Sequence, residues 1–133
     1  MNSKQLKVGN LSENNIAEFF QKHGYWAYVL PKKIGGQPFD IIACKNNTVW
    51  FIDAKHLRKE ELSFPFDRIE PNQRSSMQYA KYFAGITNLG FVIDWERTDN
   101  GLFFLPYEQV IEIEQKGLKS VKITELKRME EKL

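Results

Sequence analysis

Two apolar runs on either side of an asparagine pair constrain this chain more than any other feature. Residues 39–44 and 48–54 are rich in β-branched and aromatic side chains, and Asn46-Asn47 separates them. Because asparagine tolerates the positive φ angles of a tight turn, this stretch predicts an antiparallel β-hairpin. Asp40 and Asp53 each lie about six residues from the turn. The hairpin would therefore place these two carboxylates opposite each other.

A basic side chain accompanies the two acids. Lys55 follows Asp53 by two positions, so on an extended strand both side chains point to the same face. Carboxylates that come close repel each other, and a divalent cation that prefers oxygen ligands removes this repulsion. We therefore predict that Asp40 and Asp53 bind Mg²⁺ (or Mn²⁺), and that Lys55 orients or deprotonates a water molecule or stabilises charge on a phosphate. The alternative is a solvated hairpin face on which Asp-x-Lys is an ordinary ion pair.

This pattern resembles the motif of the PD-(D/E)xK nuclease superfamily. Pro38-Phe39-Asp40 corresponds to its first half, with one residue inserted between proline and aspartate. Asp53-Ala54-Lys55 corresponds to its second half, with aspartate where glutamate is commoner.

The N-terminal part resembles the first helix of Holliday junction resolvases of this superfamily, in which a glutamate faces the metal site. The resemblance lies in the spacing from Gly9 to Glu13, followed by apolar residues and Gly24-Tyr25. It implies that Glu13, rather than Glu18, completes the metal site. The alternative for Glu13 is a favourable charge in the first turn of a helix.

A further resemblance is to the RecU-type Holliday junction resolvases. It lies in Phe51-x-Asp53-Ala54-Lys55, then Ile69-x-x-x-Gln73, then the strand-like run at 90–94. In that group a glutamine on the helix after the D/E-x-K strand lies close to the catalytic lysine, which implies that Gln73 is an auxiliary active-site residue. The alternative for Gln73 is an exposed helix residue. RecU-type enzymes also carry a long stalk between early strands, and residues 31–38 leave room only for a truncated one, which leaves junction selectivity open.

Basic residues near the predicted site are candidates for binding a DNA backbone. Lys32 and Lys33 lie in a Pro/Gly loop before the hairpin, Arg58 and Lys59 follow the Lys55 strand, and Arg74 lies in the first turn of the next predicted helix. Lysine and arginine neutralise phosphates without reading bases, so binding should weaken steeply with salt. The alternative for the loop is a solvated turn.

The rest of the chain predicts a mixed central β-sheet flanked by helices, which is an α/β fold. The resemblance implies a restriction-endonuclease-like core. We expect a single domain over residues 1–133, in which the mostly polar residues 1–10 form a flexible arm. Further helices are expected at 11–23, 71–84, 107–114 and 123–133, and further strands at 25–30, 88–95 and 101–106.

Composition adds few constraints. The net charge of +2 is only mildly basic, so it does not by itself indicate nucleic-acid binding. The one cysteine, Cys44, lies in a predicted strand and cannot form an internal disulfide. The sequence has no apolar run long enough to span a membrane and nothing that resembles a signal peptide. We therefore expect a cytoplasmic protein without a membrane anchor or a small-molecule cofactor.

Together these features predict a metal-dependent, structure-selective DNA endonuclease that hydrolyses phosphodiester bonds. The resemblance implies that it resolves four-way (Holliday) junctions in DNA recombination and repair, as a homodimer, because paired nicks need two active sites. Candidates for the dimer interface are the apolar strand edges together with Trp50, Trp95 and Phe103-Phe104. Two alternatives stay open: a nuclease of other specificity (nicking, repair or restriction-like), and a catalytically silent DNA-binding module.

Overall fold

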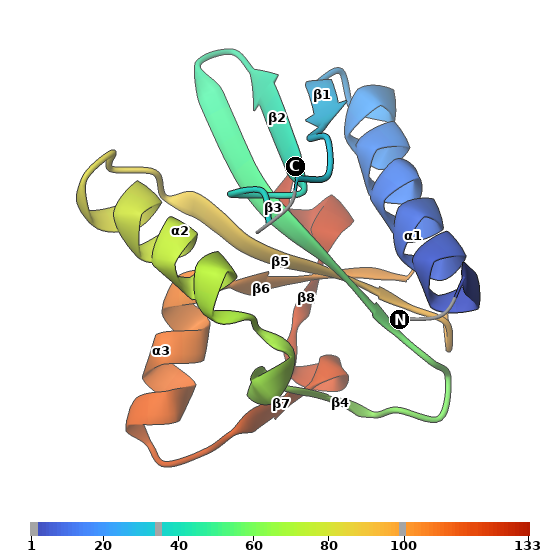
Figure 1. The fold of residues 1–133 in the computed structure, drawn as a ribbon, viewed down its shortest axis with the longest axis vertical. Coiled ribbons are helices and arrows are strands. Elements are labelled where there is room, and N and C mark those ends of the chain that lie inside the picture. Colours follow the sequence, from blue (N-terminus) through green and yellow to red (C-terminus); the bar gives the residue numbers. More distant parts are fainter. Residues whose placement is uncertain (1–2, 34–35, 99–100) are drawn as a thin grey trace.

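A six-stranded mixed β-sheet forms the centre of the molecule, and helices cover both of its faces (Figure 1). The computed structural model describes residues 3–33, 36–98 and 101–133. In these ranges the helices are α1 (Ser3–Lys22), α2 (Pro71–Tyr82) and α3 (Tyr107–Gln115), and the strands are β1 (Trp26–Val29), β2 (Ile41–Lys45), β3 (Thr48–Leu57), β4 (Ser63–Pro65), β5 (Asn88–Trp95), β6 (Leu102–Pro106), β7 (Ser120–Lys122) and β8 (Lys127–Arg128). The main sheet has the order β1-β2-β3-β5-β6-β8, and β4 pairs with β7 in a separate small sheet. The predicted α/β fold with a mixed central sheet is confirmed.

The β2–β3 hairpin has the turn that its asparagine pair predicts. Asn46 and Asn47 have φ angles of 49° and 65°, and a two-residue type I′ turn needs positive φ at both positions. The register pairs Lys45 with Thr48 next to the turn and Ile41 with Ile52 at the far end. Extended by one residue, this register brings Asp40 and Asp53 to the same level of the hairpin.

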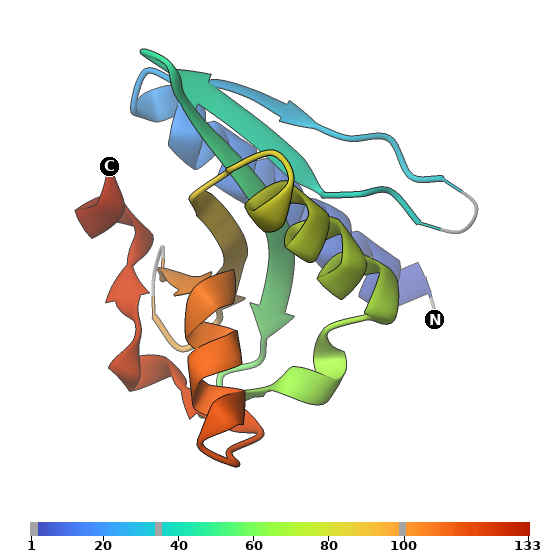
Figure 2. The ribbon, with the colours of Figure 1, turned by 90° about the vertical axis from the view of Figure 1, so that its left-hand side faces the viewer.

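The strands β3 and β5 run parallel, and α2 lies in the connection between them. A parallel pair requires such a crossover, because a tight turn can join only antiparallel strands. Figure 2 shows α2 and α3 on one side of the sheet and α1 on the other. Six of the eight residues of β5 are apolar or glycine, which suits a central strand that is covered on both faces.

Side chains alternate along β3 between two apolar cores. Trp50 and Ile52 pack in the core that includes Ile16 and Phe20 of α1. Leu57 lies in the core on the opposite face, which also contains Met77 of α2. Asp53 and Lys55 share the odd-numbered face with Leu57, so the strand period directs both toward the α2 side of the sheet.

Two predictions at the chain ends are wrong. The helix α1 begins at Ser3, so residues 3–10 are its first turns rather than a flexible arm, and residues 1–2 lie outside the described ranges. Lysine, glutamine and leucine in this segment favour a helix although most of it is polar.

The helix predicted for residues 123–133 is replaced by two short 3₁₀ turns around β8. Ile123, Leu126 and Met129 recur every third residue, which resembles helical spacing, and all three are buried. Between them, Lys127 and Arg128 pair with Phe104 and Phe103 at the edge of the sheet. Backbone pairing with β6 thus outweighs the local helical pattern.

The residues predicted for a dimer interface belong to the interior instead. Trp50, Trp95, Phe103 and Phe104 are all buried, because they lie on strands whose faces are covered by helices or by the C-terminal segment. This prediction is therefore wrong. Among the described residues, no helix combines the length and apolar character needed to cross a membrane.

Candidate active site

Asp40 lies where β2 separates from β3. The strand ladder ends at the Ile41–Ile52 pair, and beyond it the Asp40 N–H donates to the Ile52 carbonyl at 3.1 Å. The Asp40 carboxylate takes the place of a strand partner: its Oδ2 accepts a hydrogen bond from the Ala54 N–H at 2.8 Å. The divergence of the two strands thus fixes this carboxylate beside Asp53, and leaves its Oδ1 to other partners.

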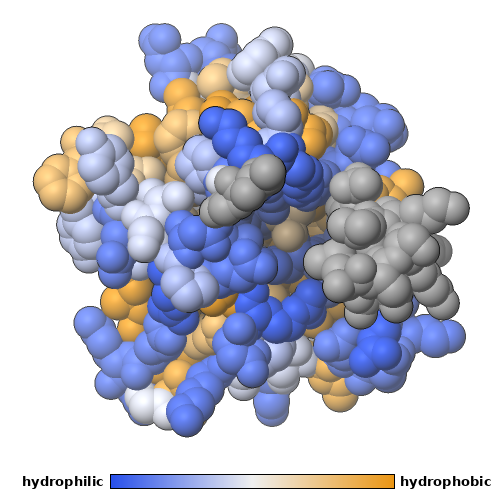
Figure 3. Space-filling view, in the orientation of Figure 1, coloured by the Kyte–Doolittle hydropathy of each residue, from blue (hydrophilic) through white to orange (hydrophobic). Residues whose placement is uncertain are grey.

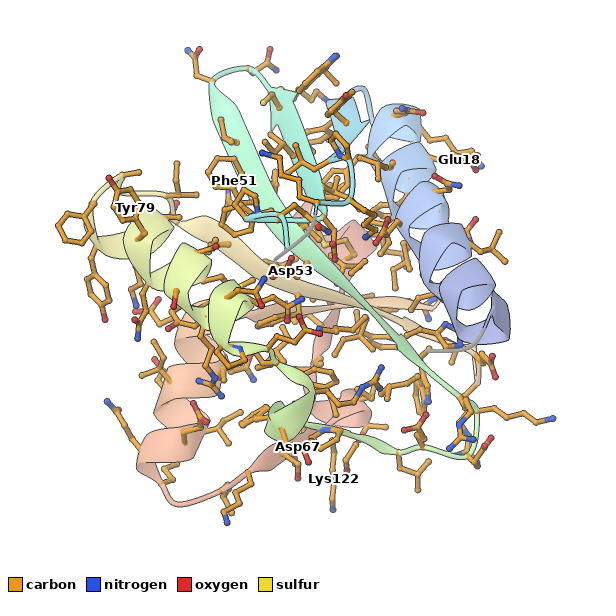
Figure 4. The ribbon with its side chains drawn as sticks, in the orientation of Figure 1. Glu18, Phe51, Asp53, Asp67, Tyr79 and Lys122 are labelled. Carbon is orange, nitrogen blue, oxygen red and sulfur yellow. The ribbon has the colours of Figure 1, made fainter. Side chains whose placement is uncertain are left out.

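Asp53 is the most deeply buried carboxyl of the site. Its side chain lies near the middle of the molecule, between α1 and α2 (Figure 4), and the residue is 1% exposed. Among the residues that the structure describes, none forms a hydrogen bond with its Oδ2. Burial, together with the negative charge of Asp40, raises the pKa of Asp53 to about 8, although Lys55 and the Asp40 N–H oppose this shift. A buried carboxylate oxygen without a partner is costly, so this geometry calls for a cation or a proton.

Lys55 lies two residues along β3 and is held by α2. Its Nζ donates to the Gln73 Oε1 at 2.9 Å and to the Arg68 carbonyl at 3.1 Å. Burial lowers the pKa of Lys55, while the nearby charges of Asp53 and Asp40 oppose the shift. An ammonium group has three N–H donors, so the two contacts leave one for a ligand.

Gln73 has a second role at the start of α2. Its Oε1 also accepts a hydrogen bond from the Glu70 N–H at 3.0 Å, and the Glu70 side chain caps the helix in return. This capping box fixes the first turn of α2. The side chain that contacts Lys55 is therefore held by the helix start.

Glu13 reaches the site from α1 through a lysine. The residue is 7% exposed, whereas Glu18 is exposed on the outer side of α1 (Figure 4). The Lys32 Nζ contacts the Glu13 Oε1 and lies 3.4 Å from the Asp40 Oδ1. Burial raises the pKa of Glu13, an effect that the Lys32 hydrogen bond opposes and the charge of Asp40 reinforces. A positive charge thus already lies between two of the three carboxylates.

The donor set fits a hard divalent cation. Among the described residues, no three His, Cys, Asp or Glu side chains form a complete metal cage. Mg²⁺ seldom needs one, because it retains water and takes one or two carboxylates together with substrate phosphates. The unpaired Asp53 Oδ2 and the cation between Glu13 and Asp40 are the two observations that indicate a positively charged ligand here.

The other basic residues predicted to bind DNA are spread over the molecule. Lys33 is exposed on the loop next to Lys32. Arg58 and Lys59 follow the end of β3, where Arg58 pairs with Glu60 and Glu61 and Lys59 lines a hollow of about 510 Å³. Arg74 forms a two-fold ion pair with Glu114 of α3, at 2.9 and 2.8 Å. Of these five residues, only Lys32 contacts the carboxylates of the site. The side chain of Arg74 joins α2 to α3.

Several polar contacts near the site have no simple sequence signal. The Gln37 Nε2 donates to the Asp40 Oδ1 at 2.8 Å, from a loop in which no periodic pattern marks it. The Ser12 Oγ donates to the Asp94 Oδ2 at 2.9 Å and lies 3.2 Å from the His56 Nδ1. His56 and Asp94 are both half-buried and tie α1 to β3 and β5. The residue next to Ser12 is Glu13, so this network also fixes the position of the glutamate.

Comparisons with known proteins agree with this architecture. Residues 38–133 match the family described as RecU, recombination protein U. A UPF0102 protein of Caldicellulosiruptor saccharolyticus is 32% identical over 85 residues, which are 63% of this chain and 70% of that protein. The structure of Hjc, a Holliday junction resolvase from Archaeoglobus fulgidus, superposes with a TM-score of 0.64 and 17% identity over 93% of both chains. This structural likeness confirms the expected restriction-endonuclease-like core.

Proposed function

This chain belongs to the recombination protein U family, and on that premise we propose that it is a metal-dependent endonuclease that hydrolyses phosphodiester bonds in branched DNA. Its substrate class would be the four-way junction of recombination and repair. The observation that carries the proposal is the buried Asp53 carboxyl with an unpaired oxygen, two residues from a lysine that Gln73 holds. Costly buried groups of this kind are typical of active sites.

In the proposed site, Asp40 and Asp53 would hold Mg²⁺ (or Mn²⁺), and Glu13 would complete the site directly or through water. The ion, when bound, supplies positive charge that polarises the phosphate and lowers the pKa of a water molecule. Lys55 uses two N–H donors on Gln73 and Arg68, which aims its third at the attacking water or a phosphate oxygen. The lowered pKa of Lys55 also makes proton transfer easier near neutral pH.

The DNA backbone would be held by lysines at the site. Lys33 lies exposed on the loop that leads into Asp40, and its charge suits a phosphate. Lys32, on the same loop, is paired with Glu13 and Asp40 and would contact a phosphate once a metal ion binds these carboxylates. The ion pairs of Arg74 and Arg58 make these residues weaker candidates than their charge alone predicts. We further propose that one nuclease domain spans the chain and that two copies act together, because two symmetric nicks require two sites.

The proposal is tested with a labelled mobile four-way junction and a linear duplex of matching sequence, each incubated with Mg²⁺, with Mn²⁺ and with EDTA. We expect symmetric, metal-dependent nicks in the junction alone. Equal cutting of both substrates would retain the nuclease site and replace the junction role with another specificity. No cutting with either metal would favour a silent DNA-binding module.

A further inference from the structure

One face of the β1–β3 sheet carries large aromatic side chains that are open to solvent. Trp26 and Tyr28 are 61% and 49% exposed. Both lie on β1, at the edge of the main sheet, and as residues two apart they point to the same face. Their rings are parallel within 3°, with centroids 5.9 Å apart. The two rings thus form an ordered pair rather than two unrelated surface residues.

This aromatic face continues across the sheet toward the candidate active site. The register pairs Tyr28 with Ile42 of β2, and Ile42 with Phe51 of β3. Side chains of directly paired residues share a face, and Ile42 and Phe51 are both only partly buried. The next residue on this face of β3 is Asp53, which Figure 4 shows beside Phe51 along the strand. From strand spacing and rise, Tyr28 lies roughly 12 Å from Asp53, which is within the reach of a short single strand.

Only one face of the β1–β3 part of the sheet is covered by a helix. The opposite face carries Ile41, Ala43 and Trp50, which pack in the core that α1 completes. On the aromatic side, α2 lies farther along the sheet, over β3 and β5, and does not extend over the upper part of the hairpin (Figures 1 and 2). Figure 3 shows hydrophobic surface over the hairpin at the top of the view. The rings of Trp26 and Tyr28 are therefore available to a ligand, whereas the Phe51 ring stacks on that of the buried Phe39.

The charges around this face suit a polyanion. Between residues 22 and 59 the only acids are Asp40 and Asp53, which belong to the candidate active site, whereas seven residues are basic. Of these, Lys33 lies exposed on the loop that follows β1. Nucleobases stack on aromatic side chains whatever their sequence, with lysines holding the backbone beside them. A purely apolar protein partner would gain nothing from the lysines.

We propose that this aromatic face, formed by Trp26 and Tyr28 with Ile42 and Phe51 beside them, binds unpaired bases of branched DNA on its two exposed rings and leads the strand to Asp40 and Asp53. The inference deepens the proposed function and rests on it. A four-way junction interrupts base stacking where its arms meet, so that a base there can open onto the two rings, whereas a continuous duplex keeps its bases stacked. Stacking on β1 therefore gives this chain a means of selecting branched DNA in place of a long stalk.

Binding can be measured without cleavage, in EDTA, by the fluorescence anisotropy of labelled DNA for every variant, and by intrinsic fluorescence for the proteins that retain Trp26. Trp50 and Trp95 are buried, so a base that stacks on Trp26 should quench mainly the exposed tryptophan. The ligands are oligodeoxythymidine, a four-way junction and a fully paired duplex. The test variant is Trp26→Thr/Tyr28→Thr, because threonine favours an exposed strand. The matched control is Tyr79→Ala/Phe83→Ala, which removes two aromatic side chains at the far end of α2 that are more exposed (66% and 79%) than Trp26 and Tyr28.

We expect oligodeoxythymidine to quench the wild-type fluorescence. The β1 double variant should bind oligodeoxythymidine and the junction at least about tenfold more weakly, and the duplex with unchanged affinity, because each stacked base contributes strongly to binding. The α2 control should bind all three ligands as wild type does. Equal losses for duplex and junction, or no loss at all, would overturn the proposal.

Sedimentation of the same variants supplies an independent check. If the β1 double variant changes a dimer into a monomer, the aromatic face is an interface between copies and the proposal is wrong. Cleavage assays separate this inference from the proposed function. A protein that binds oligodeoxythymidine through Trp26 but never cuts DNA would retain the aromatic face and lose the nuclease role. A protein that cuts junctions but shows no quenching by oligodeoxythymidine would retain the nuclease role and lose the aromatic face.

Discussion

At the scale of single residues, the site is governed by the cost of burying Asp53. Its carboxyl lies beside Asp40 and away from water, so the neutral form is favoured until a cation arrives. The pKa of an aspartate in an unfolded chain is about 3.9. Because the folded pKa is raised above this value, the resulting stability is fully present below about pH 4 and is lost as the pH rises through about 8.

In EDTA, the wild-type protein should therefore unfold at progressively lower urea concentration as the pH is raised from 5 to 9. The asparagine of Asp53→Asn cannot ionise, so the stability of this variant should depend much less on pH. At pH 9 its free energy of unfolding should exceed that of the wild type by a few kcal/mol, because each unit of pKa shift corresponds to about 1.4 kcal/mol. Adding Mg²⁺ should restore the stability of the wild-type protein at high pH, but it should not change the stability of Asp53→Asn. Asp67→Asn, at an exposed position, is the control and should follow the wild type. Parallel curves for wild type and Asp53→Asn would contradict the assigned burial of this charge.

Gln73 connects the chemistry of Lys55 to the start of α2. Gln73→Ala removes an acceptor from both the Lys55 Nζ and the Glu70 N–H, so it should lower both cleavage and stability, the latter by about 1 kcal/mol. Gln73→Glu retains the capping box and should regain stability. Its negative charge should raise the pKa of Lys55 and move the corresponding limb of the pH–rate profile to higher pH. If Gln73→Glu leaves the profile in place, Gln73 acts only as a helix cap.

At the scale of elements, the site depends on how α1 is fixed against the sheet. Apolar contacts bind its face to β2 and β3, and Ser12 adds a polar contact with Asp94 and His56. Since Ser12 precedes Glu13, this contact sets which turn of α1 faces Asp40. The helix thus contributes a carboxylate to a site whose other acids come from a single hairpin.

Ser12→Ala should leave the half-buried Asp94 without its hydrogen bond, and we expect a loss of about 1–3 kcal/mol in the free energy of unfolding. Ser75→Ala, on the exposed side of α2, should change it by less than about 0.5 kcal/mol. Urea denaturation followed by circular dichroism compares the two. Equal stability of both variants would show that the Ser12 network does not hold α1.

The hairpin and its acids could be predicted because every signal for them is local. The turn type follows from Asn46-Asn47, and the pleat then fixes the faces of Asp53 and Lys55. The strand at 88–95 was likewise evident from its apolar run. In contrast, β8 is defined by its pairing with β6, far earlier in the chain, and the bridge from Lys32 to Glu13 joins a loop to a helix 19 residues away. Such contacts depend on tertiary packing, which local patterns do not specify.

At the scale of the whole molecule, the fold brings together side chains from α1, from the segment before β2, from β3 and from α2. The family match begins at residue 38, so Glu13 and Lys32 lie outside the matched segment, although the structural likeness covers 93% of the chain. We propose that these side chains form one catalytic site and that cleavage requires Asp53. The aromatic face of β1–β3 then extends the same site toward its substrate.

The most direct test is single-turnover cleavage of a labelled four-way junction in Mg²⁺ by wild type, Asp53→Asn and the surface control Asp67→Asn, with circular dichroism to verify that each is folded. We predict that Asp53→Asn is folded but slower by more than about a thousandfold, because it loses charge at the proposed metal site, while Asp67→Asn cuts as wild type does. A folded Asp53→Asn protein that cuts the junction within about tenfold of the wild-type rate would contradict the assignment of this site.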